Sequence, residues 1–226
     1  MIKKIKIKKD SLADEILLFK STDELSRINI LFGGNGVGKT TLLKSIYDKE
    51  VILECDDDKE VITDMYSNSS DNFRNMPGCL DLYKNPLEAT LQILHAKELS
   101  EGQSIIYSIL SYLNHIKQLA LENANKTLVI LLDEIDSGLA ADHINLLVHK
   151  LIEITKEYKN IQFFISTNHY HWIYIFKKVL NMYTGKEILI SSYEEYYSIL
   201  ASNMGRLGAL RDGAFLREAS YDIRKF

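Results

Sequence analysis

Residues 28–47 have the sequence INILFGGNGVGKTTLLKSIY, in which an apolar run is followed by glycines, a lysine, two threonines and a helical pattern. A strand that turns through glycines into a helix brings backbone N–H groups and the positive end of the helix to one point. Four residues separate Gly33 from Gly38, and Lys39-Thr40 follows directly, which is the spacing of a P-loop. The alternative is a glycine-rich turn that happens to precede a helix.

The residue types of this loop suit a nucleoside triphosphate. Glycines let the backbone approach phosphate oxygens closely, Lys39 can reach the β and γ phosphates, and the Thr40 hydroxyl can ligate Mg²⁺. We therefore predict nucleotide binding with Mg²⁺ as the cofactor. The predicted nucleotide-binding residues of the loop are Gly33, Gly34, Asn35, Gly36, Val37, Gly38, Lys39, Thr40 and Thr41.

A pair of acids follows the apolar run of residues 128–132. Such a run is typical of a strand buried on both faces. Asp133 at its end can hold Mg²⁺ through water, and Glu134 can orient or deprotonate an attacking water. We therefore predict Thr40 and Asp133 as metal ligands and Glu134 and Lys39 as catalytic residues of a hydrolase. The alternative is a buried strand that ends in two solvated acids.

Strands and helices alternate along most of the chain, which predicts an α/β fold. We expect a mainly parallel sheet flanked by helices, with an antiparallel β edge that includes the alternating Ile5 and Ile7. The expected strands cover residues 15–19, 27–32, 127–132, 161–166 and 187–190. The expected helices cover residues 40–47, 102–122 and 140–158, and two more begin near 170 and 193.

The length of 226 residues predicts a single domain, residues 1–226, with a small insertion at about 51–98. Within this insertion we expect two short β-like runs, a polar loop at 67–77 and one or two helices around 87–99 that would form a reduced helical subdomain.

Composition narrows the function classes. The net charge of −4 does not support nucleic-acid binding, although the C-terminal arginines Arg206, Arg211, Arg217 and Arg224 leave it open. Cys55 and Cys79 form no metal-binding pair, and a reducing cytoplasm fits them better than a disulfide framework. We find no apolar stretch of membrane-spanning length and no signal peptide, so we expect a cytoplasmic protein.

The segment before the expected helix at 102–122 has the sequence LSEGQ, residues 99–103. Ser100 and Gln103 have the spacing of a capping box, which is a purely structural account of the segment. Gly102 is less expected there, because glycine costs about 1 kcal/mol relative to alanine inside a helix. A glycine in the first turn is useful where a ligand must approach the backbone closely.

Together with the P-loop and Asp133-Glu134, this segment resembles the signature of the ATP-binding-cassette (ABC) ATPases. Asp136-Ser137-Gly138-Leu139 looks like the loop that crosses the dimer interface in that family, and Ser166-Thr167-Asn168-His169 looks like the switch-histidine segment. The elements occur in the family's order. The resemblance implies a P-loop NTPase fold, ATP as the substrate and a head-to-tail homodimer with two ATP molecules between the subunits.

In such a dimer, Ser100, Gly102 and Gln103 of one subunit would bind the γ-phosphate held by the P-loop of the other. His169 would contact the same phosphate from its own subunit. Glu101 stands where the family commonly has glycine, and Gln92 or residues 67–74 are alternatives for the family's glutamine loop. Phe19 is a candidate contact for the adenine.

The chain looks closest to small stand-alone AAA-labelled, ABC-like ATPases related to RecF and chromosome-maintenance heads. That resemblance implies an ATPase that drives or resets an unidentified protein partner, in DNA repair or phage defence. One alternative is the nucleotide-binding subunit of an ABC transporter. Another is a binding module that dimerises on ATP and hydrolyses it slowly.

Overall fold

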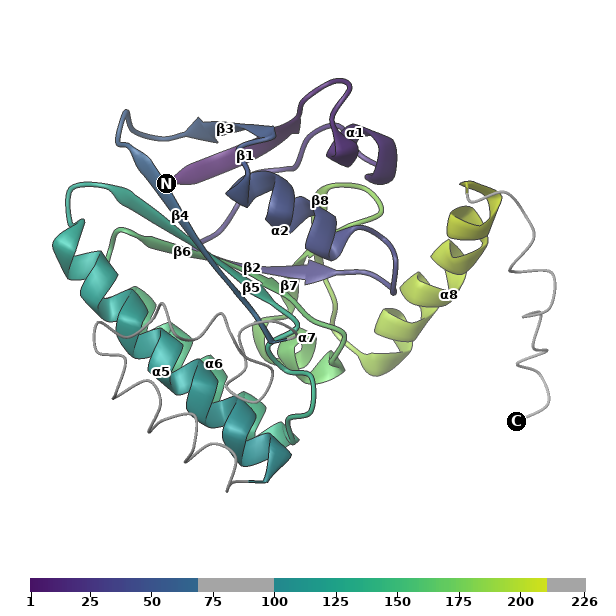
Figure 1. Cartoon of the computed structure of the whole chain (residues 1–226). Helices are drawn as coiled ribbons and strands as arrows, with labels where there is room; N and C mark the ends of the chain where they lie inside the picture. The colour runs from purple at the N-terminus through teal and green to yellow at the C-terminus, as the bar shows by residue number, and fades with distance from the viewer. Residues whose placement is uncertain (69–99, 211–226) are drawn as a thin grey trace.

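A six-stranded sheet in the order β4-β5-β6-β2-β7-β8 forms the centre of the molecule (Figure 1). The protein is seen here in a computed structural model that describes residues 1–68 and 100–210. The strands are β2 (Ile28–Phe32), β4 (Val61–Ser67), β5 (Thr127–Asp133), β6 (Ile161–Ser166), β7 (Lys178–Asn181) and β8 (Lys186–Leu189). Neighbouring strands from β4 to β7 pair in parallel, and β8 pairs antiparallel with β7. The prediction of a mainly parallel sheet is confirmed.

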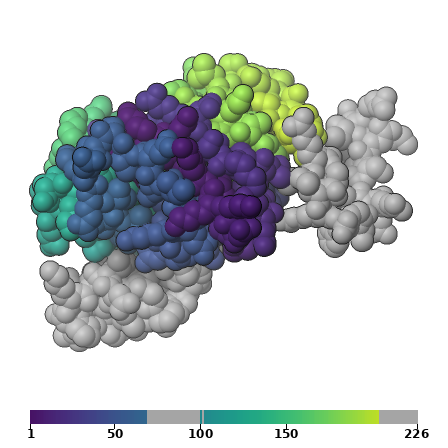
Figure 2. Space-filling model, turned by 90° about the horizontal axis from the view of Figure 1, so that it is seen from above, coloured from purple at the N-terminus to yellow at the C-terminus, as the bar shows by residue number. Residues whose placement is uncertain are grey.

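A smaller antiparallel sheet of β1 (Ile2–Ile7) and β3 (Val51–Cys55) lies above one face of the central sheet, with α2 (Lys39–Tyr47) between the two (Figure 1). In the view from above, the N-terminal part of the chain in purple and blue covers much of this face (Figure 2). The other helices are α1 (Leu12–Ile16), α5 (Glu101–Glu122), α6 (Ala141–Glu157), α7 (Tyr170–Phe176) and α8 (Tyr193–Leu210).

Strand β5 shows why the central sheet needs cover on both faces. Its side chains Leu128, Ile130 and Leu132 belong to the hydrophobic cluster that includes α5 and α6. The intervening Val129 and Leu131 belong to the cluster that includes α2 and the small sheet. All five are 0% exposed, because alternate residues of a strand point to opposite faces. The packed layers therefore fix the position of β5. Its carboxyl end, with Asp133, lies where the parallel strands of the sheet end.

Two sequence-based expectations about elements were wrong. No strand forms at 15–19: the first two of these residues end the short helix α1, and residues 17–19 have no regular secondary structure. The first turn of α1 is capped because the Ser11 hydroxyl accepts from the Asp14 N–H at 3.2 Å. The strand β7 was not expected at all, because its four residues follow α7 after a single residue and show no clear period. The other expected strands and helices are present with small shifts at their ends.

Several expectations fall outside the residues that the structure describes. These are most of the polar loop at 67–77, the helices around 87–99, Gln92, Cys79, the side chains of Glu101 and Arg206, and the arginines Arg211, Arg217 and Arg224. The single-domain organisation stays a prediction. Strand β3 belongs to the small sheet, and β4, the next strand in the sequence, belongs to the central sheet. Within the described residues, no helix combines the length and apolar composition that crossing a lipid bilayer requires.

Candidate nucleotide-binding site

The P-loop joins the end of β2 to the start of α2. Its backbone takes left-handed conformations at Gly36, with φ of 78°, and at Gly38, with φ of 96°. Both positions favour glycine, because other residues rarely adopt such angles. Gly38 immediately precedes α2, and no side chain in the described part of the chain caps the helix there. The first N–H groups of α2 therefore remain available to an anion.

A pocket of about 280 Å³ lies against this loop. Besides P-loop residues, it is lined by Ile16 of α1, by Glu134 after β5 and by Asn168 after β6. Strands β2, β5 and β6 are neighbours in the sheet, so their carboxyl ends meet at this edge. The topology thus brings residues that are far apart in the sequence to one pocket. Among residues 1–68 and 100–210, the pocket is lined by Ile16, Asn35, Gly36, Gly38, Lys39, Thr40, Thr41, Glu134 and Asn168.

The ammonium group of Lys39 is held by three oxygen atoms. Its Nζ donates to Gly33 O at 2.7 Å, to Gly34 O at 3.2 Å and to Asn168 Oδ1 at 2.7 Å. The residue is only 7% exposed. This burial lowers the pKa of Lys39, while the nearby negative charges, chiefly that of Glu134, oppose the shift. A buried cation with neutral acceptors is well suited to exchange one of them for a phosphate oxygen.

Thr40 and Asp133 are in direct contact where the P-loop meets the end of β5. The Thr40 hydroxyl donates to Asp133 Oδ1 at 3.0 Å, and the Ser166 hydroxyl donates to the same oxygen. Asp133 is 5% exposed and lies at the last position of β5. A hydroxyl and a carboxylate oxygen are ligands that Mg²⁺ takes in phosphate sites. The donor set therefore fits the predicted metal, with Ser166 as a support that sequence analysis did not identify.

Glu134 occupies a left-handed backbone conformation, with φ of 51°. Its backbone N–H donates to Ser166 Oγ at 3.1 Å, which holds the chain in this turn. Backbone strain of this kind persists only where the surrounding structure enforces it, and it concentrates at functional sites. The turn leaves the Glu134 side chain exposed and able to line the P-loop pocket.

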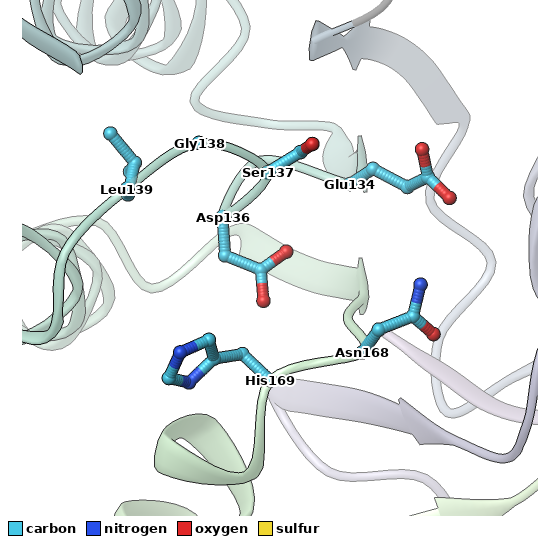
Figure 3. A pocket seen from close by; sticks show the side chains of 7 residues that line it. All are labelled: Glu134, Asp136, Ser137, Gly138, Leu139, Asn168 and His169. Atoms are coloured by element: carbon cyan, nitrogen blue, oxygen red, sulfur yellow. The ribbon is translucent and has the colours of Figure 1, made fainter.

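A second pocket of about 430 Å³ adjoins the first and shares Glu134 and Asn168 with it. The predicted interface loop Asp136-Ser137-Gly138-Leu139 and His169 complete its lining (Figure 3). Asp136 is 7% exposed and accepts a hydrogen bond from the Thr167 hydroxyl. Burial raises the pKa of Asp136, and the Thr167 hydrogen bond partly offsets this effect.

Asn168 lines both pockets and His169 lines only the second, and the phosphate contact predicted for His169 stays a prediction. In Figure 3 the Asn168 amide lies at the same end of the pocket as the Glu134 carboxylate, and the His169 ring lies away from it. His169 lines the second pocket and not the P-loop pocket. Its Nδ1 accepts from the His171 N–H at 3.3 Å and caps α7. Asn168, one residue earlier, is the group of this segment that contacts Lys39.

The segment that resembles the family signature forms the expected capping box at the start of α5. Ser100 N donates to Gln103 Oε1 at 3.0 Å, and Gln103 N donates to Ser100 Oγ at 3.4 Å. Both residues are exposed. Neither they nor Gly102 line the P-loop pocket or the adjoining pocket. The segment does not serve the P-loop of its own chain in this conformation.

Phe19 does not lie where a nucleotide base could stack on it. The ring is 5% exposed and packs in the cluster around α2, next to the turn at Gly185. The candidate adenine contact is therefore wrong. Ile16 reaches the P-loop pocket instead, and nothing in the alternation around residues 15–19 distinguished the two side chains.

Comparison with models of known families identifies the family of this chain. Residues 29–178, from β2 to the first residue of β7, match the model of the ATPase family associated with various cellular activities (AAA). The chain belongs to the AAA family. This AAA protein is an ATP hydrolase with a P-loop site, as its sequence predicts.

Solved structures show what fold this AAA ATPase shares. The ATP-binding cassette MJ1267 of an ABC transporter matches with a TM-score of 0.50 at 15% identity, over 93% of this chain and 99% of the cassette. CbiO1 from Clostridium perfringens, part of the ABC transporter complex cbiONQ, is 17% identical, with a TM-score of 0.49 over 92% of this chain and 98% of CbiO1.

The dimeric bacterial cassette MJ0796 is 16% identical, with a TM-score of 0.49 over 85% of this chain and 100% of that one. No curated protein matches the sequence. The likeness to MJ1267 confirms the predicted P-loop NTPase fold of the ABC type.

Proposed function

We propose that this AAA ATPase binds Mg-ATP in the P-loop pocket, dimerises head to tail around it and uses hydrolysis to drive or reset a protein partner. The observation that carries the proposal is the meeting of Lys39, Asp133, Glu134 and Asn168 at the carboxyl ends of adjacent strands. Each group has the chemistry that phosphoryl transfer to water requires.

In this proposal the P-loop amides and the start of α2 bind the phosphates, and Lys39 exchanges Asn168 Oδ1 for a phosphate oxygen. The Asn168 amide is then free to donate to the terminal phosphate. Thr40 and Asp133 would hold Mg²⁺, whose charge offsets that of the phosphates when it is bound. Glu134 orients the attacking water and accepts its proton.

The dimer is supported by where the signature segment lies. Ser100 and Gln103 are exposed at the start of α5 and do not line the pocket of their own chain. In a head-to-tail pair, Ser100, Gly102 and Gln103 bind the γ-phosphate of the other subunit. ATP shared between the subunits then favours association by mass action.

The biological role follows only from the resemblance to stand-alone ABC-like ATPases, which favours DNA repair or phage defence in the cytoplasm. One alternative is the nucleotide-binding subunit of an ABC transporter, because the transporter cassette MJ1267 has a similar fold. A module that dimerises on ATP with slow turnover is the other alternative. A pull-down with a hydrolysis-deficient variant in Mg-ATP separates these roles by the partner it retains.

The central experiment measures phosphate release and light scattering with and without Mg-ATP. Glu134→Gln keeps the shape of the side chain and removes the base, so ATP still binds, turnover falls roughly 10²–10⁴-fold and the dimer accumulates. Lys39→Ala is the control that weakens nucleotide binding itself. A Glu134→Gln protein that turns over ATP at the wild-type rate, or stays monomeric with saturated sites, contradicts the proposal.

Asn168→Ala and His169→Ala form a matched pair within the same experiment. They are adjacent in the chain, but Asn168 lines the P-loop pocket and His169 does not. We expect Asn168→Ala to reduce turnover more than His169→Ala. The opposite order would support His169 as the residue that contacts the terminal phosphate.

A further inference from the structure

We propose that Tyr183 is a positioning residue for Lys39 and acts through the peptide unit that joins Gly33 to Gly34. This inference rests on the proposed function, in which Lys39 binds the terminal phosphates. Two hydrogen bonds carry it. The Gly34 N–H donates to the Tyr183 hydroxyl at 2.9 Å, and Gly33 O accepts from Lys39 Nζ at 2.7 Å.

The two hydrogen bonds belong to one rigid group. Gly33 O and Gly34 N are atoms of the same trans peptide unit. In a planar trans peptide the C=O and N–H bonds point in opposite directions. The hydroxyl of Tyr183 on one side therefore keeps the carbonyl directed at the Lys39 ammonium on the other.

This peptide unit needs an external constraint because glycines stand on both sides of it. Glycine adopts backbone angles that other residues avoid, so rotation of the plane between Gly33 and Gly34 meets little steric resistance. A rotated peptide would turn its carbonyl away from Lys39 and present an N–H group to a cation. The Tyr183 hydroxyl opposes this rotation by accepting the Gly34 N–H.

Tyr183 is itself firmly held. It is 5% exposed and lies in the turn between β7 and β8. Its backbone N–H donates to Asn181 Oδ1 at 2.8 Å. The preceding residue, Met182, donates from its N–H to Phe32 O at 2.8 Å, directly before the P-loop. Through these hydrogen bonds the turn holds both the end of β2 and the peptide unit between Gly33 and Gly34.

The effect on Lys39 follows from its burial. Lys39 is 7% exposed, and its ammonium relies on fixed acceptors, of which Gly33 O and Asn168 Oδ1 are the closest. When phosphate displaces Asn168, the carbonyl of Gly33 remains to aim the ammonium into the pocket. Tyr183 thus preorganises the site without touching the nucleotide.

The test compares the reactivity of the Lys39 amine in nucleotide-free protein. Acetic anhydride can acylate Lys39 only when the amine leaves its buried acceptors, and mass spectrometry gives the rate at Lys39 relative to the exposed Lys44 on the same helix. Tyr183→Phe removes only the hydroxyl. A less constrained Gly33 carbonyl holds the Lys39 side chain less firmly, so Lys39 should react about 3- to 10-fold faster, the range that one weakened hydrogen bond allows. Tyr47→Phe, at the exposed end of α2, is the matched control and should leave the rate unchanged.

The same variants are then titrated with Mg-ATP, and Tyr183→Phe should bind it about 3- to 10-fold more weakly. Equal Lys39 reactivity in Tyr183→Phe and Tyr47→Phe overturns the inference. If Tyr183→Phe does not fold, Tyr183→Met fills a similar volume without the hydroxyl and decides the same comparison. A wild-type protein that binds no Mg-ATP contradicts the proposed function, whereas the reactivity comparison still decides the role of Tyr183.

Discussion

Replacing Ser166 by alanine is expected to weaken both the fold and the site. The Ser166 side chain is 0% exposed, and its hydroxyl joins two adjacent residues at the end of β5. It donates to Asp133 Oδ1 and accepts from the Glu134 N–H at 3.1 Å. Alanine removes both contacts and keeps the backbone of β6 unchanged.

The size of the effect follows from those contacts. A hydrogen bond to a charged group contributes about 1.5–3 kcal/mol, and an unsatisfied buried donor costs about 1–3 kcal/mol. The Glu134 N–H is only partly buried, so water can replace some of its lost bond. We therefore expect Ser166→Ala to lower the free energy of unfolding by about 2–4 kcal/mol. For a domain of this size that corresponds to roughly 5–15 °C in Tm.

Thermal and urea unfolding measure this loss of stability. The rate of ATP turnover shows how the less constrained Glu134 affects catalysis. Ser104→Ala is the matched control. Its hydroxyl is also in a 0% exposed residue, but it finds no hydrogen-bond partner among the described residues. The same chemical change there should be neutral or stabilising. If both variants lose less than about 0.5 kcal/mol, the Ser166 bridge does not hold the site together.

Two further predictions concern the loop after β5. Because burial raises the pKa of Asp136 above its unfolded value, its contribution to stability is present below the unfolded pKa and is lost as pH rises through the folded pKa. Asp136→Asn should therefore gain stability relative to wild type as pH rises from about 4 to 7, and urea midpoints that differ by a constant amount would contradict this. Gly138→Ala should lose about 1–2 kcal/mol, because φ there is 80° and the new Cβ would lie 2.8 Å from Ile105 Cδ1. Thermal unfolding checks it, and a matching loss in the Ile105→Val background would assign the cost to the backbone.

The central part of the fold could be predicted because its signals are local and strong. The apolar run at 128–132 and the glycine pattern before Lys39 each specify one element, and the structure places both where alternation of strands and helices puts them. The weaker signals failed at short elements. Ser11 caps the helix α1, which takes up the first two residues of the expected strand at 15–19. Strand β7 is held by pairing with β2 and not by its own pattern.

At the site, sequence reasoning identified the chemical types but not all the partners. Lys39, Asp133 and Glu134 follow from motif spacing, because strand ends and glycine turns fix them. Asn168 and Ser166 act through contacts between β5, β6 and the P-loop. These segments are far apart in the sequence, so their contacts leave no characteristic residue spacing that a motif could reveal. A polar residue at the end of a strand next to β5 is the signal that could have found them.

The conformation of Glu134 sets stability against catalysis at a single position. A left-handed backbone costs an ordinary residue about 1–2 kcal/mol, and glycine or asparagine escapes most of that cost. Neither supplies a carboxylate at the mouth of the P-loop pocket. Laboratory evolution for heat resistance alone would therefore drift toward these residues at position 134 and lose the base. Only a selection that also demands turnover would keep the glutamate.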